Sequence, residues 1–375
     1  MENVNKIYGE NRDTVIILLI PIAIIAKLIE HLILPDKYFY DSSRMLDMML
    51  GTGKMAAWGG NYEFTADFFS KLNIFNFTSL LEWSVLIGII FNIVLLIVFA
   101  RVKGLNFMQS IFALMCVGLC NIYVFNLGKD IIQFALFALC FLIIYIDKIP
   151  NWIKVVGCAL VFYWESTFFR NYYIIMSAFT IGVYFIVAII RRKKVKLNFR
   201  MWMFLLCALY LMMYIFLNIA RVMMPEEYND ILHCKDGVEI MGATTALNDN
   251  IEFGTDINLF MLNYIINSVR MLFPLELMQG GIFYMPFLLF QIALLYYMYK
   301  SLKDIHLISE KNVIALCTFI GFFMGSVLFE PDFGSFARHE AASFPIIILF
   351  ALDNSGIWKR EKMHVKDKKR LIIYE

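Results

Sequence analysis

Apolar runs of about twenty residues recur along the chain and are separated by short segments that carry charged side chains. An α-helix of that length crosses the roughly 30 Å hydrocarbon core of a bilayer. The pattern therefore predicts an all-α fold, a polytopic transmembrane helical bundle in which residues 1–375 form a single integral membrane domain. We predict about ten spanning helices, at residues 14–34, 79–100, 105–125, 131–147, 152–169, 173–190, 201–221, 281–300, 312–329 and 341–353.

Composition supports a membrane protein and excludes a soluble catalytic domain. The chain is 61% hydrophobic and 16% aromatic, whereas soluble domains are roughly half apolar. The first apolar run begins near Thr14, has no small-residue cleavage site and ends in KLIEHLILP. These features predict a retained anchor rather than a removed signal peptide.

Basic segments predict the orientation of the bundle. They are RVK at Arg101–Lys103, RRKKVK at Arg191–Lys196 and the tail around Lys359. Loops rich in lysine and arginine stay in the cytoplasm. We therefore predict that both termini are cytoplasmic, with a cytoplasmic tail at about residues 354–375.

Two longer segments, about residues 35–78 and 222–280, fall on the predicted outer side. The first mixes aromatic side chains with glycines, which predicts a lid or re-entrant element at the bilayer surface. Within the second, residues 257–273 are apolar but include Arg270. If they spanned, the basic tail would face outward, so we predict an outer interfacial or re-entrant helix there.

The motif-like polar groups beside the ends of the predicted spans, in which cations and carboxylates occur together, all fall on the outer side. Charged side chains at membrane depth are costly unless they are paired or face water, so we predict that these groups rim one outer-face cavity. The candidates are Asp41 and Arg44 after the first span, Lys129 and Asp130 before the fourth, Glu165, Arg170 and Tyr172 between the fifth and sixth, and Asp332, Gly334, Ser335, Arg338, His339 and Glu340 in EPDFGSFARHE between the last two.

A simpler interpretation competes with a site. Lysine and arginine at helix ends often extend to the lipid headgroups, and nearby carboxylates then form ordinary salt bridges. That explains a single cation at an interface, but not the repeated pairing of cations with carboxylates beside very short turns. For Lys27, Glu30 and His31 in the first span, a structural pair is the better interpretation.

Other classes of site find little support in the sequence. Residues 222–257 carry far more acidic than basic side chains, which disfavours a nucleic acid as partner. The chain has no C-x-x-C, H-E-x-x-H or D-x-D spacing and no phosphate-binding glycine loop, so we predict neither a metal nor a cofactor.

The block GSFARHE before the last span resembles the G-S/T-x-x-R-H signature of bacterial polysaccharide repeat-unit polymerases of the Wzy type, which make O-antigen, capsule and exopolysaccharide. Three earlier blocks occur in similar order in that family: Asp41 in YFYDSS, the Lys129–Asp130 pair, and Arg170–Tyr173. The chain departs from the family at Glu340, where relatives often have another basic residue.

The resemblance implies polymerisation of undecaprenyl-diphosphate-linked repeat units at the outer face of the bacterial cytoplasmic membrane. Arg338, Arg170 and Lys129 would stabilise the diphosphate leaving group. Besides membrane lipids, it implies a flippase and a chain-length regulator as partners. The base that activates the acceptor hydroxyl is His339, Asp41, Asp332 or Glu340, and the substrate-binding set is Arg170, Lys129, Asp130, Tyr172, Arg44, Glu165, Ser335 and Gly334.

Two other functions remain open. A multi-spanning glycosyltransferase that uses polyprenyl-phosphate sugars would take Asp41 as its base, although that class usually has paired acids in the first loop, and here Asp41 and Asp47 are separated. A transporter or flippase of lipid-linked sugars should show internal repeats and ionisable groups near mid-bilayer, which the sequence does not clearly contain.

Overall fold

The structure is a computed structural model that describes residues 2–102, 104–194, 197–235, 245–247 and 251–352. Helices make up almost all of this part of the chain, and no β-strand is present in it. The all-α prediction is therefore confirmed. The predicted cytoplasmic tail and part of the predicted outer segment 222–280 lie outside the described residues.

Seven helices within the described residues are long and apolar enough to cross a membrane. The chain is therefore a multi-pass membrane protein. These helices are α1 (Glu2–Leu32), α4 (Leu80–Ala100), α5 (Phe107–Leu119) with its π-helical extension η2 (Cys120–Val124), α8 (Tyr173–Arg192), α9 (Phe199–Met223), α12 (Met285–Lys303) and α13 (Glu310–Phe329).

The other three predicted spans are helical but are not among these seven helices. Helices α6 (Lys129–Tyr145) and α7 (Asn151–Phe168) have 17 and 18 residues. The last predicted span is divided into α14 (Phe333–Ala342) and α15 (Phe344–Ala351). The division follows from Pro345, which has no N–H to donate to the preceding turn. That these segments also span stays a prediction.

Helix α13 is the centre of the bundle. Of its most apolar stretch 94% is buried, so protein rather than lipid surrounds it. A Cβ added at Gly321 would lie 2.7 Å from the backbone nitrogen of Thr180, so only glycine lets α8 approach this closely. On peripheral α1, by contrast, Ile17 is 71% exposed, as expected of a side chain that faces lipid.

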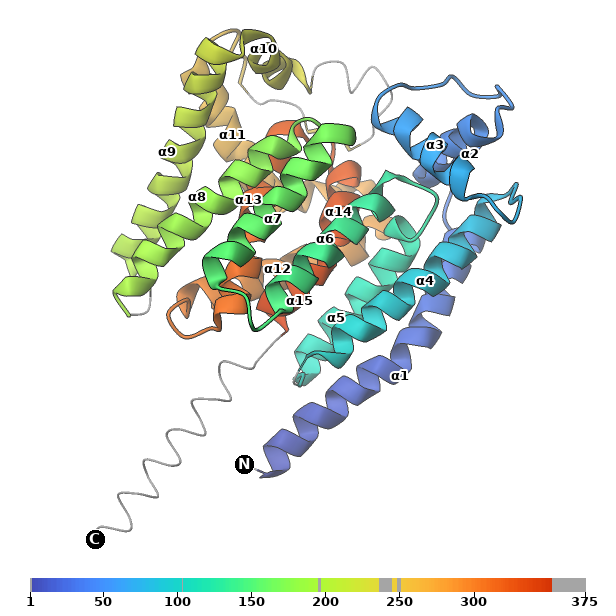
Figure 1. Cartoon of the computed structure of the whole chain (residues 1–375), viewed down its shortest axis with the longest axis horizontal. Helices are drawn as coiled ribbons and strands as arrows, with labels where there is room; N and C mark the ends of the chain where they lie inside the picture. Colours follow the sequence, from blue (N-terminus) through green and yellow to red (C-terminus); the bar gives the residue numbers. More distant parts are fainter. Residues whose placement is uncertain (1, 103, 195–196, 236–244, 248–250, 353–375) are drawn as a thin grey trace.

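The bundle has two different ends (Figure 1). The end that carries α2 (Tyr40–Leu50), α3 (Asn61–Leu72) and α10 (Pro225–His233) is called the cap end. The opposite end, called the basic end, carries residues 101–102, 104–106, 146–150, 193–194, 197–198 and 304–309. Asn11 Nδ2 donates to Leu105 O over 3.1 Å, and Gln109 Nε2 donates to Ala351 O over 2.9 Å, which joins the start of α1 and the end of α15 to the basic end.

Helix α11 (Ile257–Leu272) covers the segment predicted not to span. It has 16 residues and is not among the seven long apolar helices. Its Tyr264 hydroxyl donates to Met324 O over 3.1 Å, and its Arg270 guanidinium lies 6.0 Å from the ring of Phe333. Because Phe333 opens α14 at the cap end, α11 ends near the cap end. The short helices η1 (Asp36–Phe39), η3 (Leu275–Gly280) and η4 (Ile282–Tyr284) complete the fold.

The positive charge at the basic end leads to a topology prediction. In a variant with Cys207 and Cys234 replaced by serine, the remaining cysteines are buried. We expect Asn171→Cys, exposed at the cap end, to react with a membrane-impermeant thiol reagent added outside intact cells, and Lys193→Cys, exposed at the basic end, to stay unlabelled until the cells are opened. Labelling of Lys193→Cys alone would invert the topology.

Candidate functional site

Four segments that are far apart in the sequence bring charged side chains together at the cap end. They are the start of α2, the start of α6, the turn between α7 and α8, and the turn after α13 together with α14. The Asp332 carboxylate accepts from Ser335 N over 2.8 Å and so starts α14 at Phe333. We call the following set the charged cluster: Asp41, Lys129, Asp130, Arg170, Glu330, Arg338 and His339.

Asp41 lies between two cations. Arg338 Nη2 donates to Asp41 Oδ2 over 3.2 Å, and Lys129 Nζ is 3.9 Å from the same oxygen. Arg338 Nε also lies 3.6 Å from Asp130 Oδ2. Tyr62 of α3 covers Lys129, whose Nζ is 3.7 Å from the ring centroid. Burial and the neighbouring charge of Asp41 raise the pKa of Tyr62, so its hydroxyl stays protonated and hydrogen-bonds to Asp41.

His339 is held through both ring nitrogens. Its Nδ1 bonds to Glu330 Oε1, while its Nε2 lies 2.8 Å from Arg170 Nη2 and 3.2 Å from Asp130 Oδ1. Arginine can only donate, so a neutral His339 carries its proton on Nδ1, donates to Glu330 and accepts from Arg170 at Nε2. A second proton on Nε2 would break the bond to Arg170 and face Asp130 instead. His339 Nε2 therefore has a donor, Arg170, when it is unprotonated and an acceptor, Asp130, when it carries a proton.

Arg170 joins this group to an aromatic layer. Its Nη1 donates to Gln133 Oε1 over 3.2 Å and to the Tyr173 hydroxyl over 3.4 Å. Tyr172 hydrogen-bonds to Arg170 and stacks on Phe329, with 4.3 Å between ring centroids. Arg170 therefore belongs to the charged cluster, and Tyr172 lies beside it.

Glu165 lies in the last turn of α7, close enough to Arg170 to interact with its charge. Its side chain is fully buried, and neither of its carboxylate oxygens has a hydrogen-bond partner in the described structure. It therefore borders the charged cluster without a direct bond to it.

Two candidates lie away from the charged cluster. Arg44 is buried in the cap, where its guanidinium carbon lies 3.2 Å from the centroid of Trp58. Glu340 is fully buried and accepts from Gln291 Nε2 of α12 over 3.3 Å. Successive side chains on a helix point about 100° apart, so Glu340 faces the core although it follows His339 directly.

Gly334 and Ser335, predicted to bind substrate, lie in a turn that is held by hydrogen bonds within the protein. The Ser335 N–H donates to Asp332, and the Ser335 hydroxyl bonds to Glu330. A Cβ added at Gly334 would lie 3.0 Å from Asp332 Oδ1, so this glycine serves the tight turn. Burial raises the pKa of Asp332, which also lies 3.5 Å from Thr245 Oγ1. Asp332 is thus occupied as a helix cap.

Sequence reasoning missed Glu330, Gln133 and Tyr62. Glu330 belongs to the same short block as His339, and its position next to a proline at the end of an apolar run was a usable signal. Gln133 lies one turn after Lys129 on α6, on the same side of the helix. No pattern in the sequence indicates that Tyr62, on a separate cap helix, covers Lys129.

The charged cluster leaves little empty space between its side chains, and its lysine and arginine charges are matched by carboxylates. A hollow of about 20 Å³, lined by Asp41, Lys129, Asp130 and Arg338 among others, has room for roughly one water molecule. The three cations Lys129, Arg170 and Arg338 face three carboxylates. An anionic ligand would therefore have to displace a carboxylate. Of these three carboxylates, that of Asp41 belongs to α2 at the cap end. If it moved away, both Lys129 and Arg338 would be free to bind the ligand.

No family model, no curated protein and no solved structure matches this chain. Within the described residues, no group of three or more His, Cys, Asp and Glu side chains could hold a metal ion. The function is therefore inferred from the chemistry of the charged cluster itself.

Glu340 provides a prediction about stability. Among the described residues, Glu340 Oε2 and Gln291 Oε1 are buried without a hydrogen-bond partner, and a proton on Glu340 would make Oε2 a donor for Gln291 Oε1. We therefore expect Glu340→Gln to leave the thermal unfolding temperature of the purified protein unchanged. Glu340→Ala should lower it, because an unpaired buried amide costs about 1–3 kcal/mol. A folded but inactive Glu340→Gln would show instead that the charge of Glu340 is needed.

Proposed function

We propose that the protein polymerises undecaprenyl-diphosphate-linked oligosaccharide repeat units at the outer face of the bacterial cytoplasmic membrane. One observation carries the proposal: Lys129, Arg170 and Arg338, from three separate segments, meet beside a histidine that is oriented by Glu330. Cations next to an oriented proton acceptor are what transfer from a lipid diphosphate to a hydroxyl requires.

The cations bind the donor. The donor diphosphate takes the place of Asp41 on Arg338 and Lys129, so that the leaving group meets a forked guanidinium and a point charge. As the bond between the anomeric carbon and the diphosphate oxygen breaks, negative charge develops on that oxygen. Arginine and lysine near this charge lower the barrier more than they stabilise the bound ground state.

His339 accepts the proton. The oxygen of the acceptor hydroxyl attacks the anomeric carbon, a new glycosidic bond forms, and undecaprenyl diphosphate leaves. The hydroxyl proton passes to Nε2 of His339, while Glu330 at Nδ1 stabilises the resulting imidazolium. Arg170 releases Nε2 when the charged substrate enters and offers its guanidinium to the diphosphate.

The chain would work with a flippase that delivers repeat units to the outer leaflet and with a chain-length regulator. Loss of the gene, followed by analysis of lipid-linked glycans, tests the proposal. We expect single complete repeat units to accumulate on the lipid carrier. Complete repeats confined to the inner leaflet would indicate a flippase instead.

A transferase that uses polyprenyl-phosphate sugars is the second candidate. The position of Asp41 favours it. Asp41 follows the first span, on α2, and lies between Arg338 and Lys129, where a phosphate would bind. Loss of such an enzyme would leave an incomplete repeat that lacks one sugar. The composition of the accumulated glycan therefore separates the two functions.

A further inference from the structure

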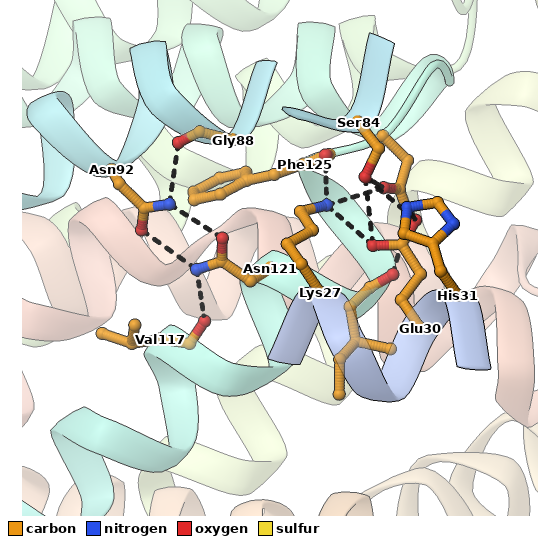
Figure 2. Close-up of polar contacts among 11 residues, drawn as sticks. Lys27, Glu30, His31, Ser84, Gly88, Asn92, Val117, Asn121 and Phe125 are labelled. Atoms are coloured by element: carbon orange, nitrogen blue, oxygen red, sulfur yellow. Dashed lines mark hydrogen bonds and ion pairs between the residues drawn. The ribbon is translucent and has the colours of Figure 1, made fainter. Parts of the chain in front are cut away.

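A second polar group is built around Lys27 of α1 and Ser84 of α4 (Figure 2). Lys27 Nζ donates to Glu30 Oε2 over 2.8 Å, to Phe125 O over 2.8 Å and to Asn126 Oδ1 over 2.9 Å. These bonds use all three protons of the ammonium group. Ser84 Oγ lies 3.1 and 3.2 Å from the two Glu30 oxygens and 3.1 Å from Asn126 Oδ1. Glu30 and Asn126 are thus held in fixed positions.

An amide pair deeper in the bundle supports this arrangement. Asn92 of α4 and Asn121 of η2 exchange two hydrogen bonds of 2.8 and 3.0 Å, and each also donates to a backbone carbonyl, of Gly88 and Val117 respectively (Figure 2). Asn121 belongs to the π-helical turn that precedes Phe125 and Asn126. Such turns occur often at functional sites. Here the pair fixes the chain that leads from α5 to Lys129.

The fixed side chains border a hollow of about 90 Å³, which we call the acidic hollow. It has room for several hydroxyl-sized groups. Ser42, Asn126 and Phe39 line both this hollow and the one at the charged cluster, so the two are direct neighbours. The polar residues of its wall are Glu30, His31, Asp36, Ser42, Ser43 and Asn126.

The two hollows differ in chemistry. The one at the charged cluster presents Lys129 and Arg338, which suit phosphate. The acidic hollow presents serine hydroxyls and the carboxylates of Asp36 and Glu30, of which Glu30 is paired with Lys27. Carboxylates accept hydrogen bonds from sugar hydroxyls and repel anionic groups.

We propose that the acidic hollow binds the acceptor sugar, which is uncharged and rich in hydroxyl groups, while the charged cluster binds the donor diphosphate. This rests on the proposed function. Glycosyl transfer needs the acceptor oxygen within about 3–3.5 Å of the anomeric carbon. Two adjoining hollows, one for phosphate and one for hydroxyls, place donor and acceptor side by side. A uronic acid or phosphorylated sugar in the acidic hollow would meet the like charge of Asp36.

Ser43→Leu tests the acidic hollow alone, because Ser43 lines it but is absent from the lining of the hollow at the charged cluster. Ser70→Leu, the same change at an exposed site on α3, is the matched control. The full-length protein in lipid nanodiscs is given lipid-linked repeat units and, as soluble acceptor, the oligosaccharide released from them by mild acid. The acceptor concentration that gives half-maximal rate is measured for each protein.

We expect Ser43→Leu to raise this concentration about tenfold or more, the effect of losing one or two hydrogen bonds, with the dependence on lipid-linked donor unchanged. Ser70→Leu should match the wild type. If the wild-type protein transfers no glycan, the proposed function fails. If it does, but Ser43→Leu uses the acceptor as well as the wild type, the acidic hollow is not the acceptor site. If Ser43→Leu does not accumulate, Ser43→Ala is measured instead, with a smaller expected rise in the same direction.

The charge of the hollow is tested separately. Asp36→Asn should improve the use of an acceptor oligosaccharide that carries a uronic acid relative to its neutral counterpart, because one repelling carboxylate is gone. An unchanged preference in this variant would remove the electrostatic part of the proposal.

Discussion

Arg338→Lys is expected to lower polymer synthesis about a hundredfold, while the protein still inserts and accumulates normally. Arg338 directs two different nitrogens at two carboxylates, Nη2 at Asp41 and Nε toward Asp130. The same fork can hold two phosphate oxygens when the donor arrives. Lysine keeps the charge but is a single point donor. It cannot bridge Asp130 and the diphosphate at once.

The matched control is Arg200→Lys, the same substitution at an exposed position of α9 near the basic end. It should leave polymer amount and length unchanged. Membrane levels of both variants are compared by immunoblot, and lipid-linked glycans are separated by size. Polymer of normal amount and length from Arg338→Lys, at normal protein level, would show that the fork is not required and would favour an anchoring role for this arginine.

Much of the charged cluster could be predicted from the sequence for one physical reason. Spans cross in alternating directions, so charged residues after odd-numbered spans and before even-numbered ones must share one side of the bundle. This parity brought together Asp41, Lys129, Arg170 and Arg338 although they are far apart in the chain. It requires only that apolar runs be recognised, which is the strongest signal in a membrane protein.

Parity does not determine which way a side chain points. Glu340 follows His339 in the sequence but faces Gln291 in the core, because the start of α14 at Phe333 sets the rotation of the whole helix. Arg44 is one turn after Asp41 but stacks on Trp58, a contact made through a long glycine-containing loop. Both outcomes depend on tertiary packing, which hydropathy does not encode.

The division of the last predicted span has a similar origin. Residues 341–353 are apolar enough to predict one helix, and the proline at position 345 was present in the sequence. The helix in fact begins earlier, at Phe333, because Asp332 caps it, and it is interrupted at Ser343. Capping and the missing proline N–H therefore outweigh apolar continuity here. The interruption leaves Arg338 and His339 on a short, separately oriented helix.

His339→Gln is expected to lower the rate of glycosyl transfer about a thousandfold, the usual range for loss of a general base. The amount of lipid-linked donor needed for half-maximal rate should change little, because Lys129 and Arg338 still bind the diphosphate. Glutamine is similar in size and can still donate to Glu330, so the surrounding turn is kept. What is lost is the ring nitrogen Nε2, which accepts the proton of the acceptor hydroxyl.

The same measurement decides between His339 and Asp41 as base. His306→Gln at the basic end is the matched control and should be active. Asp41→Asn removes a counter-ion of Arg338 and Lys129 but leaves the histidine in place, so we expect a loss well below that of His339→Gln. If instead Asp41→Asn abolishes transfer and His339→Gln retains it, the proton goes to Asp41. That outcome would favour the transferase that uses polyprenyl-phosphate sugars, for which Asp41 is the expected base. The Glu330–His339 pair would then be a structural contact.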